Sequence, residues 1–134
     1  MKVKESELTE KLILPLHNHI QNGTVIFLQG DMGSGKTTFV NYFCSSLGIT
    51  HTSSPTFAIA NIYEGRFRVY HLDLYRLQTQ DAVYSIDIDR YLDQSDGITL
   101  IEWPERLNEH EVSNPIWIVF KYVSPRIRDI SIKL

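Results

Sequence analysis

A glycine-rich run that ends in a lysine and a threonine, at residues 30–37, has the composition needed to hold a chain of phosphates. Its order is a glycine, four residues, and then Gly35, Lys36 and Thr37, which is the P-loop pattern. Glycines let the backbone approach an anion and adopt positive φ, so that successive N–H groups point at it. Lys36 would reach the β- and γ-phosphates, and the Thr37 hydroxyl would bind Mg²⁺. The pattern therefore predicts binding of a nucleoside triphosphate together with Mg²⁺.

Such a loop works only between a strand and a helix, and the flanking residues predict both. Residues 24–28 are a short β-branched and apolar run, typical of a buried strand. Residues 38–47 are expected to form a helix that ends at Gly48, a natural C-cap. The apolar positions at helical spacing in that segment are Phe39, Val40, Phe43 and Leu47. This order places the positive end of the helix dipole against a bound phosphate.

Hydrolysis also needs carboxylates that hold the metal ion and orient a water molecule, at strand ends beside the first strand. Two acidic residues fit that description, because Asp73 follows the run 70–72 and Glu102 follows the run 98–101. An acidic residue is also common at strand ends that have no function. The two assignments therefore depend on the P-loop being present.

Thr56 lies in the polar segment that follows the predicted P-loop helix. In nucleotide switches, a threonine hydroxyl or backbone N–H in this place senses the γ-phosphate and orders the loop. The same residue could instead cap a helix or a strand. The residues alone leave both roles open.

The remaining pattern predicts one α/β domain with a mixed sheet over residues 1–134. An amphipathic helix is expected over residues 6–21, interrupted by Pro15, and a weaker helix over residues 81–92. A hairpin is expected from residues 58–63 and 67–74. Further strands are expected at residues 98–101, 116–122 and 128–134.

The composition is that of an ordinary globular protein, with 43% hydrophobic and 22% charged residues. A formal net charge of −3 argues against general binding to a nucleic-acid backbone. The one cysteine, Cys44, permits no internal disulfide and is expected to be a buried or half-buried thiol. No apolar run approaches 18 residues, and the first residues lack an apolar secretory segment. We therefore expect no membrane span and a cytoplasmic location.

Four blocks occur together: GDMGSGKTTF at residues 30–39, SPTF at 54–57, HLDLYRL at 71–77 and IEWPER at 101–106. In order and spacing they resemble the TsaE (YjeE) family, from about Leu8 to the C-terminus. The P-loop block is generic, whereas the other three together are distinctive. The resemblance implies a P-loop NTPase-like three-layer fold with a mixed, mostly parallel central sheet. Family members are small bacterial ATPases that act with TsaD, TsaB and TsaC to form threonylcarbamoyladenosine beside the tRNA anticodon.

Carried over residue by residue, the resemblance makes Lys36 and Thr37 the P-loop lysine and the Mg²⁺-binding threonine. Asp73 and Glu102 match two acids linked to metal binding and ATP hydrolysis, and Thr37, Glu102 and Asp73 form the implied metal site. Trp103 matches a tryptophan beside the nucleotide, although packing alone would also explain it. Tyr75 and Arg76 match the family block without a fixed role. The implied nucleotide-binding residues are Gly33, Ser34, Gly35, Lys36, Thr37, Thr38, Thr56 and Trp103.

The implied activity is slow Mg²⁺-dependent ATP hydrolysis that supports tRNA modification by acting on a TsaB–TsaD partner complex. Contact with tRNA is expected only indirectly or through a local basic cluster, for which the candidates are Arg66, Arg68, Arg126 and Arg128. Arg76 and Arg106 are the candidates for an arginine finger in cis. Without such a residue an isolated chain hydrolyses ATP slowly, because a finger contributes about 10³–10⁵ in rate.

Three other functions are alternatives to this one. A GTPase would need Asn-Lys-x-Asp to read guanine, and the chain contains no Asn-Lys pair. A small P-loop kinase remains open, although 134 residues leave little room for a lid and an acceptor pocket. The serious alternative is a nucleotide-gated binding module in which hydrolysis is incidental. Absence of turnover, both alone and with the TsaB–TsaD pair, would leave only that module.

Overall fold

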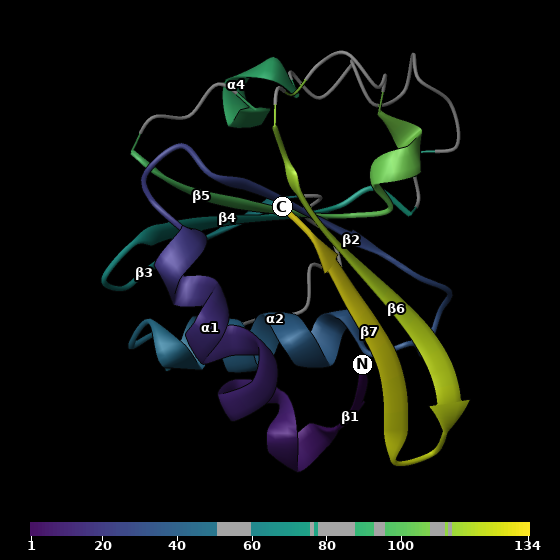
Figure 1. Cartoon of the computed structure of the whole chain (residues 1–134). Coiled ribbons are helices and arrows are strands. Elements are labelled where there is room, and N and C mark those ends of the chain that lie inside the picture. Colours follow the sequence, from purple (N-terminus) through teal and green to yellow (C-terminus); the bar gives the residue numbers. More distant parts are fainter. Residues whose placement is uncertain (51–59, 76, 78–87, 93–95, 108–111, 113) are drawn as a thin grey trace.

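The computed structural model describes residues 1–50, 60–75, 77, 88–92, 96–107, 112 and 114–134 (Figure 1). Within these residues, seven strands form one sheet in the order β1-β7-β6-β2-β5-β4-β3. The central pairings β6–β2, β2–β5 and β5–β4 are parallel, and the outer pairings are antiparallel. This mixed sheet confirms the predicted α/β class. The strands are β1 (Lys2–Lys4), β2 (Val25–Gln29), β3 (Ala60–Glu64), β4 (Arg68–Asp73), β5 (Gly97–Glu102), β6 (Ile116–Ser124) and β7 (Ile127–Lys133).

Helices lie on both faces of the sheet (Figure 1). One face carries η1 (Glu5–Glu7), η2 (Thr9–Ile13), α1 (Leu14–Leu16), η3 (His17–His19) and α2 (Lys36–Ser46). The other face carries α4 (Asp89–Leu92), and the turn η4 (Pro104–Arg106) follows β5. In the part of the chain that is described, none of these helices has the length and apolarity that crossing a membrane would require.

The N-terminal helical segment is a series of short turns rather than one regular helix. The π-helical turn η2 precedes α1, and the 3₁₀ turn η3 follows it. Pro15 lies within α1 and lacks the N–H that a regular helix needs, which explains the predicted interruption. The predicted apolar stripe is confirmed, because Leu8, Leu12 and Leu16 are buried and Ile20 packs against the same core.

The helix after the P-loop ends with the two hydrogen bonds of a Schellman motif. The Ile49 N–H donates to the carbonyl of Cys44, and the Gly48 N–H donates to that of Ser45, each at 3.0 Å. Gly48 has a φ of +81°, as the motif requires. The helix packs on the sheet through Phe39, whose ring centroid lies 5.7 Å from that of Phe120 on β6. These contacts hold the start of α2 in place at the end of β2.

The predicted hairpin forms between β3 and β4, where Ile62 lies opposite Tyr70, while residues 58–59 of the prediction lie outside the described residues. The last two predicted strands form a second hairpin, β6–β7, with Phe120 opposite Ile130. The predicted helix 81–92 is described only in its last part, as α4, and residues 81–87 lie outside the described residues.

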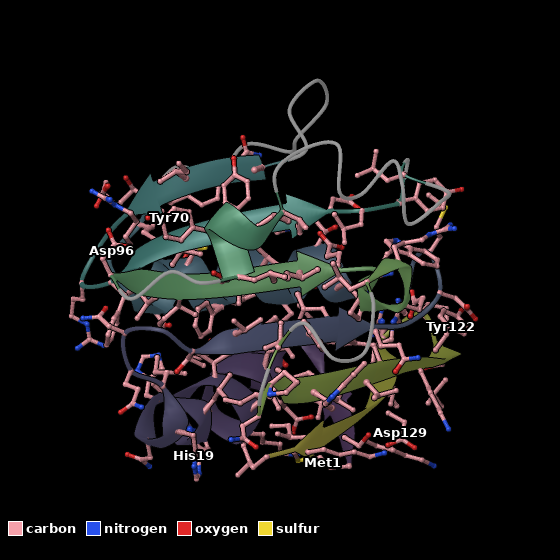
Figure 2. All side chains as sticks on the ribbon, turned by 90° about the horizontal axis from the view of Figure 1, so that it is seen from above. Met1, His19, Tyr70, Asp96, Tyr122 and Asp129 are labelled. Carbon is pink, nitrogen blue, oxygen red and sulfur yellow. The ribbon has the colours of Figure 1, made fainter. Side chains whose placement is uncertain are left out.

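Strand β1 was not predicted, because three residues are too few to show a period. It pairs with β7 in antiparallel register, with Lys2 opposite Asp129. The terminal ammonium group of Met1 adds an ion pair, lying 3.0 Å from Oδ1 of Asp129; Figure 2 labels both residues.

Burial of Cys44 leads to a testable prediction about its reactivity. The side chain has no exposed surface, and burial raises the pKa of its thiol to about 12. Because the thiolate is the nucleophile, a colorimetric thiol reagent at about pH 8 should react far more slowly with native than with urea-unfolded protein. Equal labelling rates for the two forms would contradict the burial of this side chain.

Candidate nucleotide-binding site

The loop between β2 and α2 has the backbone shape of a phosphate cradle. Gly33 and Gly35 have φ values of +76° and +107°, which side chains disfavour. A Cβ on Gly30 would lie 2.6 Å from Oγ of Ser34 and 2.7 Å from the carbonyl oxygen of Phe120. The first glycine of the motif is therefore required by close packing, and Gly33 and Gly35 by their backbone conformation.

Lys36 begins α2 and folds back over the loop. Its Nζ donates to the carbonyl oxygen of Gly30 at 2.5 Å and lies 3.8 Å from the centroid of the Trp103 ring. Burial lowers the pKa of the Lys36 ammonium, while the nearby carboxylates of Glu102 and Asp73 act in the opposite direction. A positive charge with little exposed surface is thereby held at the mouth of the P-loop.

The two predicted acids end neighbouring strands and lie opposite each other. Asp73 ends β4 and Glu102 ends β5, and the parallel register pairs them directly. Because β5 also lies next to β2, both side chains reach the edge of the sheet that carries the P-loop. Burial raises the pKa of Asp73, the charge of Glu102 adds to this, and a 3.0 Å hydrogen bond from the Tyr75 N–H opposes it.

His71, on β4, forms a hydrogen bond with the buried carboxylate of Glu102. The two side chains are 3% and 5% exposed, and His71 Nε2 donates to Oε2 of Glu102 at 2.6 Å. Among the described residues, the second ring nitrogen, Nδ1, has no hydrogen-bond partner. No role was predicted for His71, although a signal was available. His71 and Asp73 are two positions apart on a strand and therefore face the same side of the sheet.

These elements enclose a cavity of about 260 Å³ at the P-loop. Of the predicted site residues, Ser34 is buried behind the loop, and Thr56 lies outside the described residues, as does Arg76. The other predicted nucleotide-binding, metal-binding and catalytic residues line the cavity, whereas Arg106, the second arginine-finger candidate, lies in η4 and is not part of the lining. Its full lining is Met32, Gly33, Gly35, Lys36, Thr37, Thr38, Asp73, Tyr75, Glu102, Trp103 and Arg128.

The donor set fits Mg²⁺ bound together with a nucleotide. Within the described residues, no group of three or more His, Cys, Asp or Glu side chains could hold a metal ion alone. Thr37 offers a hydroxyl, and Asp73 and Glu102 offer two carboxylates, all on one cavity. Mg²⁺ typically binds one or two carboxylates, substrate phosphates and several waters, rather than a cage made of protein alone.

The four arginines considered as one basic cluster are not brought together. Arg66 and Arg68 belong to the β3–β4 hairpin, at the end of β4 that lies away from Asp73. Arg68 is paired with Glu64 at 2.6 Å and with Asp96 at 3.1 Å, and Figure 2 labels Asp96 at this edge. The other two, Arg126 and Arg128, belong to the β6–β7 hairpin on the far side of β2, and Arg128 reaches the P-loop.

A comparison of the whole sequence with known families identifies one that spans nearly all of it. The family model described as threonylcarbamoyl adenosine biosynthesis protein TsaE matches residues 3–130. The chain belongs to the TsaE family. The resemblance seen in the four sequence blocks is thereby confirmed.

Three similar proteins carry the name tRNA threonylcarbamoyladenosine biosynthesis protein TsaE. The Synechocystis protein is 51% identical over 90 residues, which cover 63% of this chain and 57% of that protein. The Nostoc protein is 44% identical over 77% of this chain and 66% of its own length. The Bacillus subtilis protein is 37% identical, with coverages of 81% and 68%. The matched part of the chain thus spans between 57% and 68% of these relatives.

The fold of this TsaE family member is also similar to a solved structure. The crystal structure of YdiB from Bacillus subtilis matches it with a TM-score of 0.72 at 31% sequence identity. The match covers 97% of this chain and 82% of YdiB. This similarity supports the P-loop NTPase-like fold predicted from the sequence.

The His71–Glu102 contact leads to a prediction about stability. His71→Ala leaves the buried Glu102 carboxylate without its donor, so the free energy of unfolding should fall by about 1–3 kcal/mol in urea titrations. In a Glu102→Ala background the same substitution should cost markedly less, because the two side chains are coupled. An equal loss in both backgrounds would show that the hydrogen bond does not contribute to stability.

Proposed function

We propose that residues 1–134 form one P-loop ATPase domain, which hydrolyses ATP slowly with Mg²⁺ and acts on a TsaB–TsaD complex. The process served is tRNA threonylcarbamoyladenosine biosynthesis in the cytoplasm. Family membership supports the process. The observation that carries the activity is the convergence of Lys36, Asp73 and Glu102, from three separate elements, on one cavity of about 260 Å³.

Each side chain has a role that its position supports. The N–H groups of residues 33–38 and the Lys36 ammonium bind the phosphate chain. Thr37, Asp73 and Glu102 would hold Mg²⁺, which neutralises phosphate charge when it is bound. The carboxylate of Glu102 orients the attacking water and accepts its proton, while His71 keeps Oε2 fixed.

Aromatic side chains form the outer wall of the cavity. The ring centroids of Tyr75 and Trp103 are 5.1 Å apart, and both rings line the site. Trp103 has a φ of +62°, a conformation that is uncommon for a side chain of this size. Its ring packs against the edge of the core on one part and lies against the Lys36 ammonium on another. The two rings would limit access of bulk water to the reacting phosphate.

The placement of the arginines that the structure describes supports slow turnover by the isolated chain. Among the described residues, Arg128 is the one arginine that lines the P-loop cavity, and it enters from the opposite side of β2 to the two acids. Its hydrogen bonds go to the carbonyls of Ser124, Ile127 and Gly33, which hold it at the P-loop rather than at the acids. We therefore expect a partner to supply or order the missing group.

The decisive experiment measures phosphate release from ATP and from GTP, with and without the TsaB–TsaD complex. The chain alone should turn over slowly with a preference for ATP, and the complex should stimulate it clearly. Partner proteins without the chain serve as the control. Nucleotide binding without turnover under either condition would leave only the nucleotide-gated binding module.

Two substitutions should separate catalysis from binding. Glu102→Ala should lower kcat by about 10²–10⁴-fold with nucleotide affinity largely kept. Glu102→Gln is the matched control for packing, because its amide oxygen still accepts a hydrogen bond from His71. This variant should lose turnover while its free energy of unfolding stays close to that of wild type. Lys36→Ala should instead weaken nucleotide binding itself, by about ten- to hundredfold.

Steady-state kinetics and calorimetric nucleotide binding would measure both effects. Normal turnover in Glu102→Gln would show that this carboxylate does not act on the water. Unchanged nucleotide affinity in Lys36→Ala would remove the P-loop assignment.

A further inference from the structure

Arg128, near the start of β7, lies against the P-loop although it belongs to no sequence motif. Its Nη2 donates to the carbonyl oxygen of Gly33 at 3.1 Å. Its Nη1 donates to the carbonyls of Ser124 and Ile127, at 2.6 and 3.1 Å. Its Cγ lies 3.7 Å from the place that a Cβ on Gly35 would occupy. These contacts fix the guanidinium in the wall of the P-loop cavity.

The charge of Arg128 has no acidic partner among the described residues. Its three hydrogen-bond acceptors are neutral carbonyl oxygens, and its other close contact is the Tyr122 ring, 4.6 Å away. A guanidinium has five N–H donors, so two remain. One of them, Nε, is buried and has no partner within the described part of the chain. A partly buried cation without a carboxylate favours an anionic ligand, because burying an uncompensated charge is costly.

The side from which Arg128 enters indicates which part of a nucleotide it contacts. Asp73 and Glu102 come from β4 and β5, on one side of β2, and Arg128 comes from β7, on the other. A second cavity, of about 450 Å³, lies on the Arg128 side, between residues 3–8 and the β6–β7 turn. The residues that line both cavities are Gly35, Thr38 and Arg128. Arg128 therefore lies in the wall shared by the two cavities, on the other side of β2 from the strands that carry the acids.

We infer that Arg128 binds the phosphates nearest the nucleoside, opposite the acids that act on the γ-phosphate. This inference rests on the proposed nucleotide site. A guanidinium suits the contact because three of its N–H groups are held by backbone carbonyls while its charge and the second Nη2 N–H can meet a phosphate oxygen. ADP and ATP both carry these phosphates, so Arg128 contributes equally to binding of both. An arginine finger would differ, because it would act on turnover and leave ADP binding unchanged.

The test compares calorimetric binding of Mg²⁺·ADP and of a non-hydrolysable ATP analogue in wild type, Arg128→Gln and Lys133→Gln. Lys133 is exposed on the same strand, and its substitution removes the same charge. Arg128→Gln should bind both nucleotides about ten- to hundredfold more weakly, by the same factor. Lys133→Gln should match wild type. Nucleotide affinities in Arg128→Gln equal to those of Lys133→Gln would overturn the inference.

Salt dependence separates phosphate binding from support of the loop through the Gly33 carbonyl. Between about 50 and 300 mM NaCl, wild-type affinity for ADP should fall more steeply than that of Arg128→Gln, because one charge pair is missing. Weaker binding with an unchanged salt dependence would overturn the inference and leave Arg128 a structural role.

A conservative variant covers the case in which Arg128→Gln does not fold. Arg128→Lys keeps the charge but loses the forked donors, so it should bind ADP more weakly than wild type does. Equal affinity would overturn the inference. A wild-type protein that binds neither nucleotide would refute the proposed function instead.

Discussion

The parallel pairing of β4, β5 and β2 is the constraint on which the candidate site depends. Register places Glu102 beside Leu28, at the end of β2, and beside Asp73, at the end of β4. All three strands therefore end at one edge, and two acids far apart in the sequence meet the phosphate loop. A slip of one residue in β5 would turn Glu102 to the other face of the sheet. The buried residues of β5, which include Ile98, Leu100 and Ile101, fix this register through packing.

The site buries several charges, and most of them have a polar neighbour. Glu102 is held by His71, Asp73 accepts the N–H of Tyr75, and Lys36 donates to the carbonyl of Gly30. Such contacts reduce the cost of removing a charge from water. The Lys36 side chain lies beside a loop of backbone N–H groups, so the local potential favours a polyanion even though the chain carries a net charge of −3.

The sequence predicted those parts of the molecule that depend on local patterns. A short stretch of sequence was enough to predict each of three elements: the buried strand β2, the helix α2 with its glycine cap, and the turn between β3 and β4. Strand β1 was not, because it is too short to show alternation and exists through its pairing with β7.

Parts that depend on long-range geometry were also missed. The contact of His71 with Glu102 joins residues on different strands, and Arg128 reaches Gly33 only because a distant hairpin lies beside the loop. The proposed arginine cluster failed for the same reason, since the sheet order places its two hairpins on opposite sides of β2. The predicted role of Thr56 lies outside the described residues and stays a prediction.

Gly30 has no space for a side chain, because residues outside the P-loop signature pack directly against it. The loop begins in direct van der Waals contact with the backbone of Phe120 on β6. Arg128 on β7, which is 95 positions away in the sequence, donates a hydrogen bond to the carbonyl of Gly33 in the same loop. The eight-residue signature at residues 30–37 thus supplies only part of the contacts that shape this loop. Further contacts come from residues near the C-terminus, so a family member whose final hairpin is shortened or replaced would keep its signature intact and still lose part of the proposed nucleotide site.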